Sequence, residues 1–339
     1  MLKKALLLFA VALISLSSFA KGKKDITVVF YNVENLFDTI NNPDKRDNDF
    51  TPMGKLQWDT KRYNDKISKL SYVLSSIDKE ELPALVGLCE IENRDVLEDL
   101  IDQEKLKKGK YRIAHSESPD KRGIDCALIY QKSRFRYIKQ ESINIEFPWE
   151  KEYKTRDILY VQGLVGRKDT LNIFVNHWPS RRGGQEKSEK NRVFVAKQLR
   201  KAVDKIQAKN PFAKIIIMGD FNDEPTDKAV AETLKAGNNR DSDNPMELFN
   251  LMYDMKVNGE GTYNFRGSWN MLDNLIVSNS LLNGSRGYQT LHNAGRIYRD
   301  KWICFKNKKG ILTPNKTYGG TKYYGGFSDH FPVYFKLKR

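Results

Sequence analysis

Cysteine and histidine are both scarce in this sequence. Its 339 residues include three cysteines and four histidines, and the cysteines (Cys89, Cys126 and Cys304) show none of the paired spacings that hold zinc. Cys89 and Cys126 each lie inside an apolar, strand-like run. We therefore expect buried free thiols, with neither a disulfide framework nor a zinc motif.

Long hydrophobic runs are missing beyond the N-terminus. The one such run, residues 5–14, follows Lys3 and Lys4 and precedes a small-x-small pattern that ends at Ala20. This arrangement is typical of a secretory signal peptide, and the run is shorter than the roughly 20 residues that a membrane span requires. We predict that residues 1–20 are a cleaved signal peptide, that the protein is exported to the periplasm or the medium, and that it does not insert stably into a membrane.

Internal repeats and proline- or serine-rich linkers are also absent, so we expect one catalytic domain, residues 21–339.

Acidic residues are fewer than basic ones: 43 aspartates and glutamates compare with 58 lysines and arginines, which gives a formal charge of +15. Such a surplus attracts polyanions, but a lysine-rich surface that only aids solubility has the same composition. The net charge alone therefore does not identify a binding partner. The sequence indicates no protein partner, and we expect a monomer.

Short apolar strands alternate with amphipathic helices along the chain. The spacing of apolar residues predicts helices within residues 67–77 and 190–208. This alternation indicates an α/β fold with helices layered on sheets. Strands are expected over residues 26–31, 85–91, 125–130, 157–165, 171–177, 215–220, 272–277 and 331–337.

Polar residues follow several of these apolar strands at the point where each strand ends. Side chains in such positions can converge on one rim of a sheet, where sites are normally built. Each one taken singly has an ordinary alternative as a turn former or a helix cap. The residues are Asn32, Glu90, His177, Asp220, Asn222, Asp329 and His330.

The residue types in this set favour metal-assisted attack of water on phosphorus. Glu90, Asp329 and Asn32 offer the hard oxygen ligands that Mg²⁺ prefers, and Mn²⁺ or Ca²⁺ are possible substitutes. A bound cation of this kind shields the negative oxygens of a phosphate ester. We therefore predict a magnesium site formed by these three residues.

Two of the four histidines, His177 and His330, belong to the strand-end set and are suited to proton transfer. Asp125 and Asp273 each begin an apolar strand and are available to orient an imidazole. Arg181 begins a basic, glycine-containing loop shortly after His177, which either binds phosphate or is simply solvated.

Seven short motifs occur in one order along nearly the whole chain: Phe30-Tyr-Asn-Val-Glu-Asn, Gly87-Leu-Cys-Glu-Ile-Glu-Asn, Arg122-Gly-Ile-Asp-Cys-Ala-Leu-Ile-Tyr, Asn176-His-Trp-Pro-Ser-Arg, Met218-Gly-Asp-Phe-Asn-Asp, Leu272-Asp-Asn-Leu-Ile-Val and Ser328-Asp-His-Phe-Pro-Val. In this order they resemble the metal-dependent endonuclease/exonuclease/phosphatase superfamily, specifically its deoxyribonuclease I-like branch. The resemblance implies a four-layer sandwich, in which two mixed β-sheets pack face to face with helices on both outer faces.

The resemblance also implies roles for individual residues. Glu90 is expected to be the principal metal ligand, with Asn32 and Asp329 beside it. Asp220 and Asn222 are expected to position the attacking water and the scissile phosphate.

The two histidines acquire partners from the same resemblance. His330 is expected to be held by Asp273, and His177 by Asp125. Arg156 resembles the arginine of this branch that contacts phosphate.

Two features depart from the family pattern. Cys89 stands where the family usually has glutamine before the metal-binding glutamate. The stretch 316–327, rich in tyrosine, glycine and lysine, is not part of the pattern, and it either stacks on a nucleic-acid strand or forms a surface hairpin.

These observations predict a secreted metal-dependent phosphodiesterase, a nuclease that hydrolyses DNA or RNA. The alternative within the same chemistry is a phosphatase or phosphodiesterase that acts on phospholipid, sphingomyelin or another small phosphate ester. A third possibility, a catalytically inactive module that holds DNA on its basic surface, is disfavoured by the complete set of histidines and carboxylates.

Overall fold

The computed structural model describes residues 25–283 and 287–339. The predicted signal peptide, residues 1–20, lies outside the described residues. No helix in the described part of the chain is both long and apolar enough to cross a membrane.

The first large sheet has six strands and mixed direction. β1 runs parallel to β2, and the remaining neighbours pair antiparallel. In spatial order the strands are β14 (Arg296–Ile297), β19 (Val333–Leu337), β1 (Ile26–Leu36), β2 (Leu85–Ile91), β4 (Asp125–Gln131) and β3 (Tyr111–His115).

The second large sheet has seven strands and is also mixed. β7 runs parallel to β8, and β9 parallel to β10, whereas the other pairs are antiparallel. In spatial order the strands are β5 (Phe135–Ile143), β6 (Ile158–Val165), β7 (Asp169–His177), β8 (Lys214–Asp220), β13 (Asp273–Ser278), β10 (Leu248–Asn250) and β9 (Ala236–Gly237).

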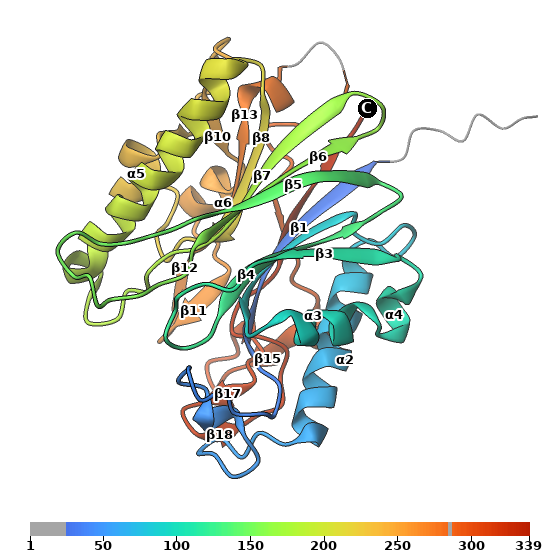
Figure 1. Cartoon of the computed structure of the whole chain (residues 1–339), viewed down its shortest axis with the longest axis vertical. Helices are drawn as coiled ribbons and strands as arrows, with labels where there is room; N and C mark the ends of the chain where they lie inside the picture. Colours follow the sequence, from blue (N-terminus) through green and yellow to red (C-terminus); the bar gives the residue numbers. More distant parts are fainter. Residues whose placement is uncertain (1–24, 284–286) are drawn as a thin grey trace, which may run out of the picture.

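Helices cover the outer faces of both sheets (Figure 1). The first sheet is covered by α2 (Thr60–Ile77), α3 (Arg94–Ile101) and α4 (Glu104–Lys107), and the second by α5 (Gln185–Lys209) and the single-turn η2 (Ala229–Thr233). The predicted four-layer sandwich is therefore confirmed. Both long helices begin earlier than predicted, and α2 does so because Asp59 caps it by accepting a hydrogen bond from the Arg62 amide.

Side-chain alternation along the strands divides the interior into three apolar layers. Val28 and Phe30 of β1 point into the core between the sheets, where they meet Ile216 of β8. Val29 and Tyr31, at the intervening positions, point toward α2 instead. Strands buried on both faces explain the continuous apolar runs in the sequence.

Short elements decorate one end of the sandwich, where the labels of β11, β15, β17 and β18 gather in Figure 1. Three small hairpins form there: β11 (Tyr263–Phe265) with β12 (Ser268–Asn270), β15 (Cys304–Lys306) with β16 (Leu312–Pro314), and β17 (Tyr318–Gly319) with β18 (Lys322–Tyr323). The stretch 316–327 is thus a hairpin, one of its two predicted alternatives. The remaining short elements are η1 (Asn48–Phe50), α6 (Tyr253–Val257), η3 (Asn279–Leu281) and η4 (Lys301–Ile303).

All three cysteines lie in the described part of the chain and are free thiols. Cys89 and Cys126 are buried and stand opposite each other on β2 and β4. Burial raises the pKa of both thiols well above its ordinary value. The prediction of buried free thiols is confirmed for this pair.

Candidate active site

Three of the predicted site residues form a row across the second sheet. The register pairs His177 of β7 with Asp220 of β8, and Asp220 with Asp273 of β13. All three side chains are buried. Because neighbouring strands end at the same level, the fold itself brings a histidine and two carboxylates together.

A hydrogen bond from the first sheet reaches this row. Asn32 Nδ2 donates to Asp220 Oδ2 at 3.0 Å, and Asn32 Oδ1 accepts from the Glu34 amide at 3.0 Å. Ser328 Oγ donates to the Asn32 carbonyl at 2.7 Å, which places the segment that carries Asp329 beside β1. The site is therefore built where the two sheets meet.

Asp220 is held from two sides. Asn32 contacts one carboxylate oxygen, and the Asn222 amide donates to the other at 2.9 Å. Asn222 has a left-handed backbone, with φ of 49°, and its side chain donates to the Trp178 carbonyl at 3.0 Å. Burial raises the pKa of Asp220 to about 6, against the opposing effect of the positive charge on His330.

His330 is fixed by a carboxylate, as the resemblance implied. Its Nδ1 lies 2.7 Å from Asp273 Oδ2, and its Nε2 lies 3.8 Å from Asp220 Oδ2. Tyr263 stacks on the imidazole with ring centroids 4.8 Å apart. Burial alone would lower the pKa of His330, but the carboxylates of Asp273 and Asp220 outweigh it, and the pKa is raised well above its ordinary value.

His177 is in the opposite electrostatic state. Its Nε2 lies 3.7 Å from Asp220 Oδ2 and 3.9 Å from Glu90 Oε1, while its Nδ1 is buried without a hydrogen-bond partner. Burial, reinforced by the positive charges of Arg156 and Arg122, lowers the pKa of His177 well below its ordinary value. The pKa values of the two imidazoles in this site are thus shifted in opposite directions.

Asp125 does not orient His177, so that prediction is wrong. Asp125 Oδ2 lies 3.1 Å from His115 Nε2, and Asp125 Oδ1 accepts from the Ser118 amide at 2.8 Å. Both oxygens are therefore engaged by β3 and the loop that follows it.

His115, Asp125 and Glu117 form the one set of three histidine, cysteine or acidic residues, among the described residues, whose ligand atoms lie within 4.8 Å of one another. Burial and the Asp125 carboxylate raise the pKa of Glu117. Asp125 stood in a recognised motif, but nothing in the sequence pointed to His115 and Glu117 as its neighbours.

Glu90 stands at an irregularity in β2. The pairing with β4 shifts between Cys89 and Ile91, and the Glu90 backbone is left-handed, with φ of 62°. A non-glycine residue in this region costs roughly 1–3 kcal/mol, and such strain is characteristic of functional sites. The Glu90 carboxylate accepts from the Asn35 amide at 2.8 Å and lies 3.9 Å from Arg122 Nη2.

Asp329 keeps about a third of its side chain exposed, 34%, and is the most accessible of the site carboxylates. Partial burial and the negative charges of Glu34 and Glu90 raise its pKa to about 7, although His330 and Lys66 oppose the shift. Negative charge is therefore concentrated at this point of the surface.

Arg156 does not face the site as a phosphate ligand, which corrects the prediction. Its buried guanidinium donates to the carbonyls of His177 at 3.2 Å and Trp178 at 2.6 Å, and pairs with Asp120 at 3.2 Å. Each of its three nitrogens is engaged within the protein. Arg156 instead fixes the backbone that carries His177.

Arg181 has a similar structural task. It donates to the Asn222 carbonyl at 2.6 Å, to Asn270 Oδ1 at 3.2 Å and to Asp227 Oδ2 at 2.7 Å. Arg181 therefore positions Asn222 and the loop after β8. The prediction that it binds phosphate is not supported, because its donors are used within the protein.

Two residues that position the site were missed by the sequence analysis. Glu34, whose φ is 52°, accepts from the amides of Thr317 and Tyr318 at 2.6 and 3.0 Å. Buried Lys66 of α2 donates to Thr317 Oγ1 at 2.6 Å and to the Phe327 carbonyl at 2.8 Å. Together they tie the β17–β18 hairpin to the site. Glu34 stood in the first motif without an assigned role, and Lys66 lay just before the predicted helix.

The comparisons with known proteins agree with this geometry. Residues 27–339 match the model of the Endonuclease/Exonuclease/phosphatase family, and the chain belongs to this family. No curated protein is similar enough in sequence to be recognised as a relative.

Solved structures share the fold at low sequence identity. TDP2 of D. rerio, in a structure described as complexed with single strand DNA product, has a TM-score of 0.57 at 16% identity over 93% of this chain and 100% of its own. The human nocturnin catalytic domain has a TM-score of 0.54 at 17% identity, over 93% of this chain and 94% of its own. An endonuclease/exonuclease/phosphatase family protein from Bacteroides thetaiotaomicron has a TM-score of 0.51 at 16% identity, over 93% of this chain and 98% of its own.

Proposed function

We propose that this protein is a divalent-metal-dependent phosphodiesterase that hydrolyses nucleic acid. The observation that carries the proposal is the row of His177, Asp220 and Asp273, joined to the other sheet by the bond between Asn32 and Asp220. The family supports a phosphoric ester hydrolase. Nucleic acid as substrate is supported by the basic surplus of the chain and by the DNA product described for TDP2.

The residues at the meeting of the two sheets fit a hard divalent cation. Glu90 is one of the negative charges that raise the pKa of Asp329, and a cation bound by the two carboxylates would oppose that effect. Asn32 Oδ1 accepts only one hydrogen bond, which leaves one lone pair for a metal. When bound, Mg²⁺ would shield the phosphate oxygens and make a coordinated water more acidic.

Side chains of the protein would orient the water and transfer the protons. Asp220, gripped by Asn32 and the Asn222 amide, is placed to orient the attacking water. His330 Nε2 and His177 Nε2 lie within 4 Å of the same Asp220 oxygen, so both imidazoles can contact a bound phosphate, and His330, whose pKa is raised, is the one suited to protonate the leaving oxygen.

A substrate panel tests the proposal. The purified protein, without residues 1–20, is assayed with Mg²⁺, Mn²⁺, Ca²⁺ or EDTA against plasmid DNA, oligonucleotides, RNA, sphingomyelin and phosphomonoesters. We expect hydrolysis of nucleic acid that EDTA abolishes. Turnover of sphingomyelin or a monoester, with nucleic acid left intact, would replace the proposed substrate with a small phosphate ester.

We also propose that the protein is exported, on the strength of the pattern in residues 1–20. Expression of the full chain in a bacterial host, followed by N-terminal sequencing of the periplasmic fraction, tests this. A mature chain that begins at Lys21 is expected, whereas an uncleaved cytoplasmic chain would contradict export.

A further inference from the structure

A deep groove leads away from the site along the short hairpins. It has a volume of about 850 Å³, and Asp329 stands in its lining. One wall is the β11–β12 hairpin, and the other is formed by residues 305–316 together with Tyr324. The stretch 316–327, which supplies part of the second wall, is the segment that departs from the family pattern.

Aromatic rings extend from the catalytic histidine into this groove. Tyr263 stacks on His330, and Phe265 follows Tyr263 with its ring nearly parallel, at an interplanar angle of 14° and a centroid distance of 6.4 Å. Phe265 is 53% exposed, and across the groove Phe305 is 55% and Tyr324 51% exposed. Exposed aromatic rings that share one groove mark a binding surface, because their burial by a ligand removes apolar area from water.

The charged residues of the groove are mostly cationic. Arg266, Lys308, Lys309 and Lys316 line it, and Asp329 is the one acidic residue among its lining residues. The Arg266 guanidinium lies 5.2 Å from the Phe265 ring centroid, so charge and ring are presented together. Apolar rings interleaved with positive charge complement a ligand that carries both flat bases and phosphates.

The walls are supported from beneath. Glu34 and Lys66 anchor the residues that follow Lys316, through Thr317 and the Phe327 carbonyl. On the opposite wall, Arg266 and Gly267 have left-handed backbones, with φ of 52° and 97°, which form a tight hairpin turn directly after Phe265. The rings are therefore presented on short, tethered hairpins.

We infer that this groove binds a single strand of nucleic acid and guides it to the site, an inference that rests on the proposed function. Unpaired bases would stack on Phe265 and Phe305, and the backbone phosphates would lie against the lysines and Arg266. A duplex presents its bases stacked upon each other, so their faces are closed to these rings. The groove thus selects unpaired strands or ends.

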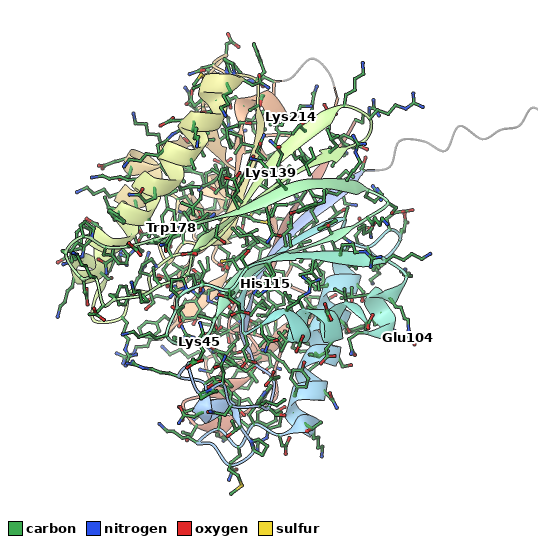
Figure 2. All side chains as sticks on the ribbon, viewed as in Figure 1. Lys45, Glu104, His115, Lys139, Trp178 and Lys214 are labelled. Atoms are coloured by element: carbon green, nitrogen blue, oxygen red, sulfur yellow. The ribbon has the colours of Figure 1, made fainter. Side chains whose placement is uncertain are left out.

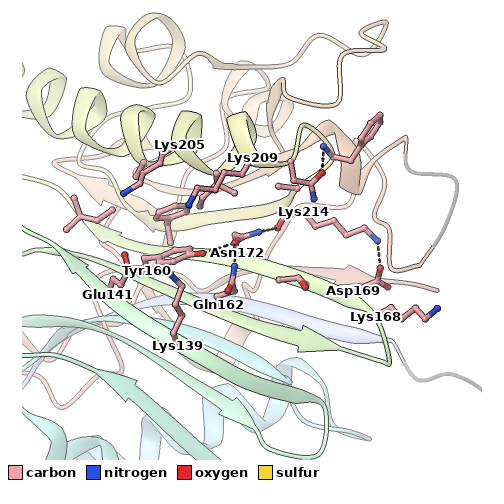
Figure 3. Close-up of a pocket in the computed structure, with 18 residues that line it drawn as sticks. Lys139, Glu141, Tyr160, Gln162, Lys168, Asp169, Asn172, Lys205, Lys209 and Lys214 are labelled. Atoms are coloured by element: carbon pink, nitrogen blue, oxygen red, sulfur yellow. Dashed lines mark hydrogen bonds and ion pairs between the residues drawn. The ribbon is translucent and has the colours of Figure 1, made fainter.

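A second basic pocket provides the matched control (Figure 3). It has a volume of about 680 Å³ and lies at the opposite ends of β7 and β8 from His177 and Asp220, and its residues Lys139 and Lys214 are far from the short hairpins (Figure 2). Lys205, Lys209 and the 69% exposed Phe212 line it. These residues match Lys308, Lys309 and Phe265 in chemistry but not in place.

The test measures binding of a short fluorescein-labelled oligothymidylate by anisotropy, in EDTA and at physiological salt, so that no cleavage occurs. We expect Phe265→Ala and Phe305→Ala each to weaken binding about tenfold, as loss of a base-stacking ring does. The double variant Lys308→Gln/Lys309→Gln is expected to weaken it and to flatten its salt dependence. The wild type is expected to prefer the single strand over a duplex of equal length.

The controls Phe212→Ala and Lys205→Gln/Lys209→Gln carry the same losses of ring and charge, and their affinity should stay within twofold of wild type. Turnover of bis(p-nitrophenyl) phosphate, which lacks the further nucleotides that would lie on Phe265 and Phe305, should be unchanged in every groove variant. Equal losses in groove and control variants, or equal affinity for duplex and single strand, would overturn the inference. If binding depends on the groove residues but the protein hydrolyses no phosphodiester, the proposed function is refuted, whereas the inference that the groove binds a single strand is retained.

Discussion

Nδ1 of His330 lies 2.7 Å from Asp273 Oδ2, and this contact joins the segment before β19 of the first sheet to the start of β13 in the second. Asp273 stands opposite Asp220 in the register, so the carboxylate that fixes the imidazole is a neighbour of the one that faces its Nε2. His177, on the other side of Asp220, has no such partner at its Nδ1. The two histidines are therefore not equivalent.

Asp273→Asn should reduce phosphodiester turnover by about 10²-fold, because His330 would lose both its orientation and the charge that favours its protonated form. Circular dichroism and the midpoint of urea unfolding should show that the variant folds. The measurement is kcat on an oligonucleotide. Turnover close to wild type would mean that His330 needs no carboxylate.

Asp125→Asn distinguishes the role of Asp125 from that of Asp273, the two aspartates that the sequence analysis assigned to the histidines. Asp125 contacts His115 and not His177, so its amide variant should keep turnover within a few-fold of wild type once folding is confirmed. A loss as large as that of Asp273→Asn would show that Asp125 does serve His177 during turnover.

The protonation states of the histidines can be read directly in metal-free protein. At neutral pH His330 should be protonated and His177 neutral, as imidazole chemical shifts from NMR will report. Because the folded pKa of His330 is raised, its stabilisation is present below the ordinary value of about 6.5 and is lost as pH rises through the folded pKa. Because the folded pKa of His177 is lowered, the unfolded chain binds a proton more readily there, and stability falls as pH decreases below about 6.5. Identical titration of both rings would contradict this account.

Arg156→Met should cost about 3–5 kcal/mol of unfolding free energy, because Asp120 would be left as a buried charge without its partner. Urea unfolding measures this loss. Arg156→Met/Asp120→Asn is the matched control and should recover part of it. A variant of normal stability with a raised KM for oligonucleotides would restore Arg156 as a phosphate ligand.

Lys66→Met should loosen the β17–β18 hairpin without disrupting the sheets. Loss of two hydrogen bonds from a charged donor is expected to speed amide exchange locally by roughly ten- to a hundredfold. Hydrogen exchange with mass spectrometry should find the change in residues 315–328 and not in β7 or β8. Unaltered exchange in the hairpin would show that Glu34 and contacts such as Lys69 Nζ to the Gly325 carbonyl anchor it without Lys66.

Much of the candidate site was accessible from the sequence because the backbone determines it. Asp220 ends β8 and Asp273 begins β13, and the antiparallel register brings these two strand ends together. Asn32 of β1 and His330, from the segment before β19, contact these two carboxylates. Polar residues beside apolar runs were therefore informative. The layers followed from the same alternation of strands and helices.

The side-chain partners were less predictable. The direction of the Asp125 carboxylate depends on Ser118 and His115, which the motif of residues 122–130 does not contain. Arg156 was identified from its resemblance to the family's phosphate-contacting arginine, but its partner Asp120 lies 36 residues away in a loop. The groove was equally hidden, since its walls come from three short hairpins with too few residues for a periodic signal.

The most direct test of the central claim compares two glutamates. Glu90→Gln should lose phosphodiester hydrolysis by at least about 10³-fold, and added Mg²⁺ should restore little, because a principal ligand of the cation would be gone. Glu117→Gln removes the same charge from the other acidic cluster, beside His115, and should keep near-normal turnover that still depends on Mg²⁺. The contradicting result is the reverse, with Glu90→Gln active and Glu117→Gln inactive, which would move the metal and the chemistry away from the meeting of the two sheets.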